Sequence, residues 1–272
     1  MGGERIGSPR SAVVVGAGIV GLSTAWFLQE HGVEVTVVDR TGVAAGASWG
    51  NAGWISPGLT IPLNEPGVLR YGLRSLLNPA APLHIPVTAD PSLWSFLLRF
   101  AANCRWSVWT RAVHANRPFS EECIEAFDVL TSNGVAAETV AAPITAAFTG
   151  RRPAEGLLAE LRRLADAGQS VDYTVLTGDE LREHVPLAGP GLTVGVRIEN
   201  QRYVDPGRFV HALGQAVTAR GAVMEKRTVT AVRADGSGVR VETADGPTFT
   251  TDVAVLAAGA WLSRLAAPHG VR

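Results

Sequence analysis

Hydrophobic and polar positions follow a strand–turn–helix–strand order near the start of the chain. Residues 12–15 (AVVV) are a short apolar run, which is typical of a strand buried on both faces. A glycine-rich turn at 16–18 leads into a helical segment, and Gly32 is placed to terminate that helix. Residues 34–38 (EVTVV) are again β-branched and apolar. The pattern predicts a βαβ unit over residues 12–39.

Residues 59–92 are predicted to be loop-like, because their prolines deny any long helix and leave room only for a short one at 68–77. From residue 92 on, segments with apolar residues at helical spacing alternate with β-branched runs. Near the C-terminus, Asp-Gly pairs at 235–236 and 245–246 divide three such runs, which predicts a β-meander followed by a buried strand. The helices expected are 68–77, 92–111, 118–132, 155–167, 178–185 and 206–220. The strands expected are 171–176, 222–226, 228–234, 239–243, 248–251 and 253–257.

The turn after the first strand has the spacing G-x-G-x-x-G. Gly16 permits a tight turn, Gly18 lets a pyrophosphate approach the backbone, and Gly21 allows close helix–strand packing. The N-terminus of the following helix offers unpaired N–H groups to phosphates. Asp39, at the end of the second strand, is placed to accept hydrogen bonds from ribose hydroxyls. We therefore expect this segment to bind the ADP half of a dinucleotide, rather than to be a glycine-rich turn without a ligand.

The loop after Asp39 bears on which dinucleotide is bound. A nicotinamide Rossmann domain usually proceeds to its next βαβ unit, whereas residues 41–58 are small, polar and glycine-rich. Ser48, Asn51 and Gly53 can bring a hydroxyl, an amide and bare backbone against a phosphate or a flavin ring. The loop favours FAD over NAD, although its composition also allows an ordinary surface loop.

Composition indicates an ordinary globular protein. The 272 residues are 46% hydrophobic and 18% charged, and the net charge of −1 gives no electrostatic case for nucleic-acid binding. Two cysteines without metal-ligand spacing form neither a disulfide scaffold nor a metal site, so we expect a reducing, cytoplasmic environment. No apolar stretch is long enough to span a bilayer. The tryptophan-rich helix at 92–111 either packs on its own domain, which we favour, or lies on a membrane surface.

Several stretches resemble one family of flavoenzymes. Residues 16–40, followed by ASWGNAGWISPG at 47–58, are similar to the FAD-dependent D-amino acid dehydrogenases, in the wider group that includes glycine and sarcosine oxidases. Asp39 departs mildly from the family, in which many members carry Glu, and either carboxylate can bind a ribose. The resemblance extends over nearly all of 12–272 and is supported by LRFAANCR at 98–105, YVDPGRFVHAL at 203–213 and VAVLAAGAW at 253–261.

The resemblance implies an α/β fold with a Rossmann-like FAD-binding domain, made of the βαβ unit and the β-meander, and an α+β substrate domain. We assign residues 1–60, 151–178 and 205–272 to a discontinuous FAD-binding domain, and residues 61–150 and 179–204 to a partial substrate domain. The resemblance further implies that the backbone of Val229 pairs with the adenine edge. The cofactor-binding residues expected in total are Gly16, Gly18, Gly21, Asp39, Arg40, Ser48, Asn51, Ala52, Gly53, Val229, Ala258, Gly259 and Trp261.

The resemblance also implies that the chain corresponds to the N-terminal two-thirds of such an enzyme, and that the C-terminal third is lacking. From this we expect an isolated chain that is poorly soluble or binds FAD weakly. A partner chain is left open as the source of the missing part.

The implied activity is oxidation of the Cα–N bond of a D-amino acid. A hydride passes to flavin N5, and water hydrolyses the resulting imine to a 2-oxo acid and ammonia. No catalytic residue and no metal site are assigned. The alternatives are a non-catalytic or inactive flavin-binding chain and an NAD-dependent dehydrogenase, and a peripheral membrane or quinone contact would accompany a dehydrogenase. A cation or phenol must hold the substrate carboxylate, and the candidates, which the sequence does not separate, are Arg70, Arg74, Arg197, Arg202 and Tyr203.

Overall fold

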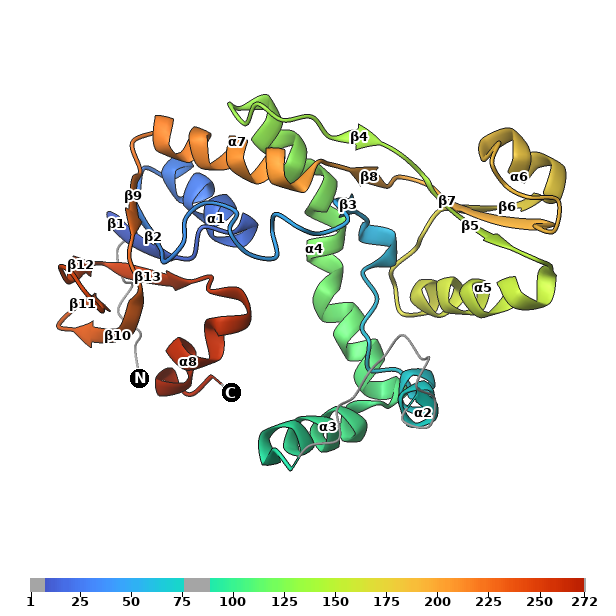
Figure 1. Cartoon of the computed structure of the whole chain (residues 1–272), viewed down its shortest axis with the longest axis horizontal. Coiled ribbons are helices and arrows are strands. Elements are labelled where there is room, and N and C mark those ends of the chain that lie inside the picture. The colour runs from blue at the N-terminus through green and yellow to red at the C-terminus, as the bar shows by residue number, and fades with distance from the viewer. Residues whose placement is uncertain (1–7, 76–88, 272) are drawn as a thin grey trace. The chain divides into compact units, whose positions relative to one another are not determined.

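Figure 1 presents the computed structural model, which describes residues 8–75 and 89–271. The chain divides into two compact units, and each is formed by more than one stretch of the sequence. The first unit comprises Met1–Trp54, Ala126–Val140 and Val204–Arg272, and the second comprises Ile55–Glu125 and Ala141–Tyr203.

The first unit is built on a parallel sheet with the strand order β13-β1-β2-β9. Its strands are β1 (Ser11–Val15), β2 (Glu34–Asp39), β9 (Val223–Lys226) and β13 (Val253–Leu256). In the register, Val15 of β1 lies opposite Val38 of β2 and Leu256 of β13. The carboxyl ends of the strands therefore meet at one edge, and β1 has a neighbour on each side. This is the position at which open α/β sheets form a ligand crevice.

Helices and a small antiparallel sheet complete the first unit. Helix α1 (Ile19–Glu30) packs against α7 (Pro206–Ala219), which begins where the Asp205 side chain accepts a 2.9 Å hydrogen bond from the Arg208 N–H. The meander β10 (Val229–Asp235), β11 (Gly238–Thr243) and β12 (Phe249–Thr251) shares a core with β1 and β2. The βαβ unit, the meander and the helix after Asp205 confirm the corresponding sequence predictions. The shared core consists of Val13, Val15, Val38, Val232 and Val241.

The second unit contains a three-stranded antiparallel sheet with the order β5-β7-β6. Its strands are β5 (Ile144–Phe148), β6 (Tyr173–Thr177) and β7 (Val194–Ile198). Helix α5 (Arg151–Asp166) packs on this sheet. The buried core of this unit includes Trp109, Leu158, Leu161, Leu164, Val196 and Ile198.

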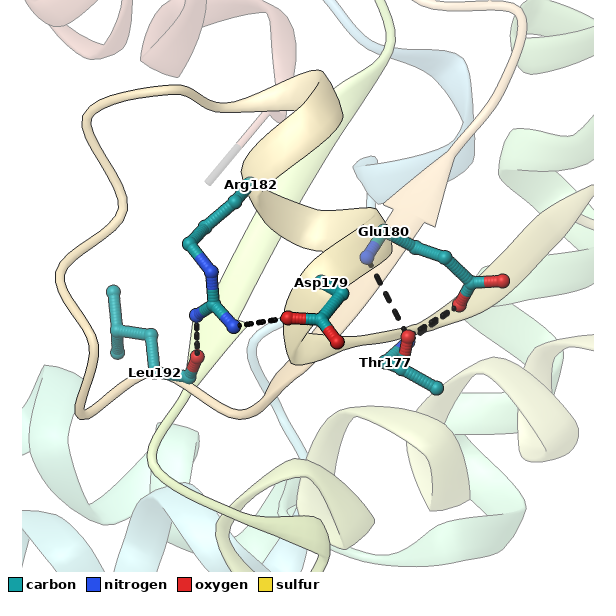
Figure 2. A network of polar contacts seen from close by, with 5 residues as sticks. All are labelled: Thr177, Asp179, Glu180, Arg182 and Leu192. Carbon is teal, nitrogen blue, oxygen red and sulfur yellow. Dashed lines mark hydrogen bonds and ion pairs between the residues drawn. The ribbon is translucent and has the colours of Figure 1, made fainter.

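Figure 2 shows the polar contacts that hold helix α6 (Gly178–His184) to the end of β6. The Thr177 hydroxyl accepts a hydrogen bond from the Glu180 N–H, and the Glu180 carboxylate accepts one of 2.7 Å from the Thr177 N–H. This capping box satisfies donors that a helix start leaves unpaired. Arg182 joins the helix to the following loop, because its guanidinium lies 2.6 Å from Asp179 and donates to the Leu192 carbonyl.

Two helix predictions are wrong. The segment expected as one helix at 92–111 is divided into α3 (Pro91–Asn103) and α4 (Trp106–Ser132). The backbone leaves the helical conformation at Cys104, and the Arg105 carbonyl accepts the N–H groups of Val108 and Trp109 in the first turn of the next helix. Pro118 does not begin a helix but lies inside α4. Pro118 has no N–H to donate to the His114 carbonyl, and both residues are exposed.

The division into units also differs from the expected domains. Residues 151–178 belong to the second unit, because β6 pairs with β7 and α5 packs on the same sheet. Residues 126–140 belong to the first unit, where the ring of Phe127 lies 5.0 Å from that of Phe209. The second unit therefore takes the α5–β6 segment that the sequence assigned to the dinucleotide domain.

The remaining elements are short. Helix α2 covers the described part of the helix expected at 68–77, whose last two residues lie outside the described range. No helix in the described part of the chain combines the length and the hydropathy that a bilayer crossing requires. The short elements not yet described are β3 (Trp54–Ile55), η1 (Pro57–Leu59), α2 (Pro66–Ser75), β4 (Val140–Ala141), β8 (Arg202–Tyr203), η2 (Gly259–Trp261), α8 (Leu262–Ala266) and η3 (Ala267–His269).

Candidate dinucleotide site

The glycine turn joins β1 to α1 with backbone contacts that exclude side chains. Gly16 has a φ of +116° and donates its N–H to the Val38 carbonyl at 2.9 Å. A Cβ atom on Gly16 would lie 2.4 Å from the Ala257 oxygen, and one on Gly21 would lie 1.9 Å from the Gly16 oxygen. Both glycines are therefore required by the fold itself, and they place the start of α1 against the end of β1.

The N-terminus of α1 faces the loop that follows β2. Gly18 is the N-cap and has no side chain with which to accept a hydrogen bond. The Ser48 hydroxyl takes that role, accepting the Ile19 N–H at 3.0 Å. The first N–H groups of a helix lack intrahelical partners and carry a partial positive charge. An oxygen acceptor is thus already seated where a phosphate oxygen would bind.

The Asp39 carboxylate organises the end of β2. Its Oδ2 accepts the Ala17 N–H at 3.0 Å. Its Oδ1 accepts the N–H groups of Thr41 and Gly42 at 2.8 and 2.9 Å, and the Thr41 hydroxyl at 3.1 Å. A carboxylate has about four lone-pair sites, so Oδ2 retains capacity for a ribose hydroxyl. Contact with a ribose stays a prediction, while the structural role of Asp39 is directly visible.

These contacts set the charge state of Asp39. Burial raises its pKa, but the hydrogen bonds from Ala17, Gly42 and Thr41 outweigh burial and hold the pKa below its ordinary value of 3.8. A carboxylate with a lowered pKa stabilises the folded state above its ordinary pKa. That contribution is lost as the pH falls through the lowered folded value.

Asp39→Asn should therefore lower the free energy of unfolding by about 1–2 kcal/mol at neutral pH, because charged acceptors make stronger hydrogen bonds. The difference from the unaltered chain should shrink in acid, below pH 3.8, as Asp39 itself becomes protonated. Urea unfolding at neutral pH and below pH 3.8 measures the difference in free energy of unfolding at each pH. Glu34→Gln, an exposed change at the other end of β2, is the matched control. A difference for Asp39→Asn that is independent of pH would contradict the assignment.

On the other side of β1, the segment after β13 brings three of the expected residues together. The Ala257 N–H donates to the Val15 carbonyl at 2.8 Å, which continues the β1–β13 pairing past the last strand residue. Gly259 has a φ of +56°, and a Cβ there would meet no atom within 4 Å. The Trp261 N–H donates to the Ala258 carbonyl at 3.1 Å, and its ring lies 4.0 Å from the guanidinium carbon of Arg40.

Asn51 and Gly53 hold their own loop. The Asn51 side-chain oxygen accepts the Gly53 N–H at 2.8 Å, and its amide donates to the Ala47 and Ser48 carbonyls at 3.1 and 3.3 Å. Gly53 is buried with a φ of +70°, and its carbonyl accepts the Val204 N–H at 2.9 Å. Ala52 between them is exposed. The structure thus adds an internal function for the loop, and ligand contact by these residues stays a prediction.

Val229 begins β10 and lies opposite Thr243 of β11. Its side chain packs against the core that β1 and β2 share with the meander. The strand was predicted, and pairing of the Val229 backbone with adenine stays a prediction.

Sequence reasoning missed the donors to Asp39. A local signal existed for Thr41, because Asp side chains often accept the N–H two residues further on, as in an Asx turn. Ala17 carries no such signal, because it takes part through its backbone alone, and the same holds for Val204, whose N–H bonds to Gly53 rather than to Asp39.

The proposed carboxylate ligands belong to the second unit. Arg197 lies 3.3 Å from Glu199 and 3.4 Å from the ring of His184. Arg202 and Tyr203 form β8, and the side chains of Arg70 and Arg74 lie outside the described part of the structure. Nothing in the geometry of the second unit selects one of these residues. Within the described residues, no three His, Cys, Asp or Glu side chains are grouped to hold a metal ion.

Sequence comparison gives a consistent family assignment. A model of the family described as FAD dependent oxidoreductase matches residues 11–272. The chain is 29% identical over 270 residues to a D-amino acid dehydrogenase from Phenylobacterium zucineum (strain HLK1), covering 96% of this chain and 62% of that protein. It is 27% identical over 271 residues to a D-amino acid dehydrogenase from Rhodopseudomonas palustris (strain HaA2), covering 95% and 62%. The chain thus spans 62% of the length of these curated relatives.

Solved structures share the fold. Glycine oxidase from Geobacillus kaustophilus is 21% identical with a TM-score of 0.65, covering 97% of this chain and 59% of that one. Glycine oxidase from Bacillus cereus ATCC 14579 is 20% identical with a TM-score of 0.62, covering 95% and 58%. L-alpha-glycerophosphate oxidase from Mycoplasma pneumoniae, solved with FAD bound, is 18% identical with a TM-score of 0.56, covering 90% and 53%. These likenesses confirm the expected fold class.

Proposed function

Since the chain belongs to the family of FAD-dependent oxidoreductases, we propose that its glycine turn and the neighbouring loops hold the ADP part of FAD. In this proposal the α1 N-terminus and Ser48 receive the pyrophosphate, and Asp39 accepts a ribose hydroxyl. The observation that carries the proposal is the hydrogen bond from the Ile19 N–H to the Ser48 hydroxyl, which indicates that an oxygen acceptor fits at the start of the helix.

The residues present fit such a cofactor. A Cβ on Gly18 would lie 3.0 Å from the Ser48 Oγ, so the absence of a side chain lets the Ser48 hydroxyl approach the start of the helix. Gly259 likewise leaves its backbone uncovered on the far side of β1. Bare backbone at both places lets phosphate or flavin atoms approach closely, which supports binding at this edge of the sheet.

We further propose that the reaction is oxidation of a D-amino acid at its Cα–N bond, because the curated relatives are named D-amino acid dehydrogenases. When bound, FAD would supply the hydride acceptor for this chemistry. The part of this chain is to bind and orient the cofactor, and a cation or phenol would hold the substrate carboxylate. The proposed substrate is a small amino acid or amine.

The first experiment is a visible absorption spectrum of the purified chain, with and without added FAD. Flavin bands that stay with the protein through desalting support the cofactor site. The amount retained also measures the predicted weak binding. A chain that retains no flavin and also leaves the absorption bands of an excess of FAD unchanged before desalting contradicts the proposal.

The second experiment tests the reaction on the flavin-loaded chain without oxygen. Bleaching by D-amino acids and not by their L-enantiomers supports the proposed substrate class. Retained flavin that no amino acid reduces would favour the non-catalytic alternative. Reoxidation by oxygen indicates an oxidase, whereas reoxidation only by a quinone analogue indicates a dehydrogenase and supports the proposed quinone contact.

A further inference from the structure

Arg40 and Trp261 leave the sheet on opposite sides of β1. Arg40 follows the last residue of β2, and Trp261 lies in the turn after β13. Since β1 lies between those strands, a contact between the two side chains connects segments on either side of the carboxyl end of β1.

The two side chains do meet. The guanidinium carbon of Arg40 lies 4.0 Å from the centre of the Trp261 ring, above its face. A planar guanidinium stacks well on an indole, and the contact is a cation–π interaction. Both residues are exposed, with Trp261 retaining 50% of its accessible surface. The pair therefore faces solvent rather than a packed core, and it lies at the same edge of the sheet as the glycine turn after β1.

Local structure holds each end of this bridge. The bonds from Thr41 and Gly42 to Asp39 fix the backbone on either side of Arg40. The Trp261 N–H on the Ala258 carbonyl fixes the turn that carries the indole, and α8 follows directly. The backbones are thus anchored, whereas the side-chain contact itself is exposed and weak enough to open.

We propose that Arg40 and Trp261 form a strap across the mouth of the dinucleotide site, closed in the ligand-free chain and opened when the dinucleotide enters. The proposal rests on the proposed function, because it takes FAD as the entering ligand. The association rate of a ligand that binds only the open form is proportional to the open fraction, so closing the strap slows binding. The strap thus regulates cofactor entry.

The test is the association rate of FAD with the unaltered chain and with Arg40→Gln, Trp261→Leu and the double variant, followed by stopped-flow quenching of flavin fluorescence. Because an exposed cation–π contact is weak, we expect its loss to make FAD associate about two- to five-fold faster with each single variant. The double variant should gain no more than either single variant, because all three lack the same contact. Arg264→Gln, an exposed change on α8, is the control and should leave the rate unchanged.

The direction of the change is decisive. If Arg40 served only to attract the phosphates, Arg40→Gln would slow association, and that result overturns the strap. Unchanged rates in both single variants overturn it as well. If the chain binds no FAD, that result contradicts the proposed function, and the strap is then tested by a measurement on the ligand-free protein. There, the indole N–H resonance of Trp261 should shift in Arg40→Gln and not in Arg264→Gln, and an unmoved resonance rejects the closed strap.

Discussion

Gly21→Ala is expected to separate α1 from β1 and to abolish retention of FAD. The added Cβ would lie 1.9 Å from the Gly16 oxygen and 3.3 Å from the Ala257 side chain. Neither the strand end nor the helix can yield without moving the other, because the Gly16 N–H is bonded to Val38 and the Ala257 N–H to Val15. Overpacking of this kind costs about 3 kcal/mol in free energy of unfolding. Urea unfolding and the flavin spectrum after desalting measure the two effects.

Two matched glycines separate folding from ligand contact. Gly46→Ala adds the same atom where nothing lies within 4 Å, so both stability and flavin retention should be unchanged. Gly18→Ala brings its Cβ to 3.0 Å from the Ser48 Oγ, a side-chain atom that can move. This variant should fold normally and lose flavin, because the methyl group fills the space proposed for the pyrophosphate. A stable, fully flavinated Gly21→Ala chain would disprove the close-packing role.

The parts of the site that the sequence predicts are those fixed by local spacing. Gly16, Gly18, Gly21 and Asp39 belong to one βαβ unit, in which the order of strand, turn and helix determines each position. Asp39 comes to the turn because parallel strands end at the same edge, and its bond with Ala17 follows from that geometry. Ser48 is predicted as a polar loop residue, but its place at the α1 N-terminus emerges only in the fold.

Features that depend on contacts between segments far apart in the chain cannot be predicted from local sequence patterns. The contact between Arg40 and Trp261 requires β13 to pair beside β1, and no local pattern encodes that choice. The same holds for the division into units, because α5 and β6 join the sheet through β7, whose small residue Gly195 weakens the strand pattern. Pro118 misled the helix prediction because proline at a first turn and proline in an exposed helix interior look alike in sequence.

Gly53→Ala has the second large expected effect, and the reason differs from the one that the sequence suggests. The sequence marks Gly53 as bare backbone for a ligand, whereas the structure places the Val204 oxygen only 2.1 Å from where its Cβ would lie. Gly53 also has a φ of +70°, a left-handed conformation that costs alanine about 1 kcal/mol. Strain and collision together should reduce the free energy of unfolding by about 3 kcal/mol.

The consequence extends from this loop to the start of α7. The Gly53 carbonyl accepts the Val204 N–H, and Val204 immediately precedes the Asp205 cap of α7. Displacing Gly53 should therefore loosen the loop that carries Ser48 as well as the helix start, so flavin retention should fall with stability. Gly50→Ala, in the same loop with no atom within 4 Å of its added Cβ, is the control for both measurements. If Gly53→Ala lost flavin while its unfolding midpoint matched that of Gly50→Ala, Gly53 would act by touching the cofactor, as the sequence suggests, and not by anchoring the loop to Val204.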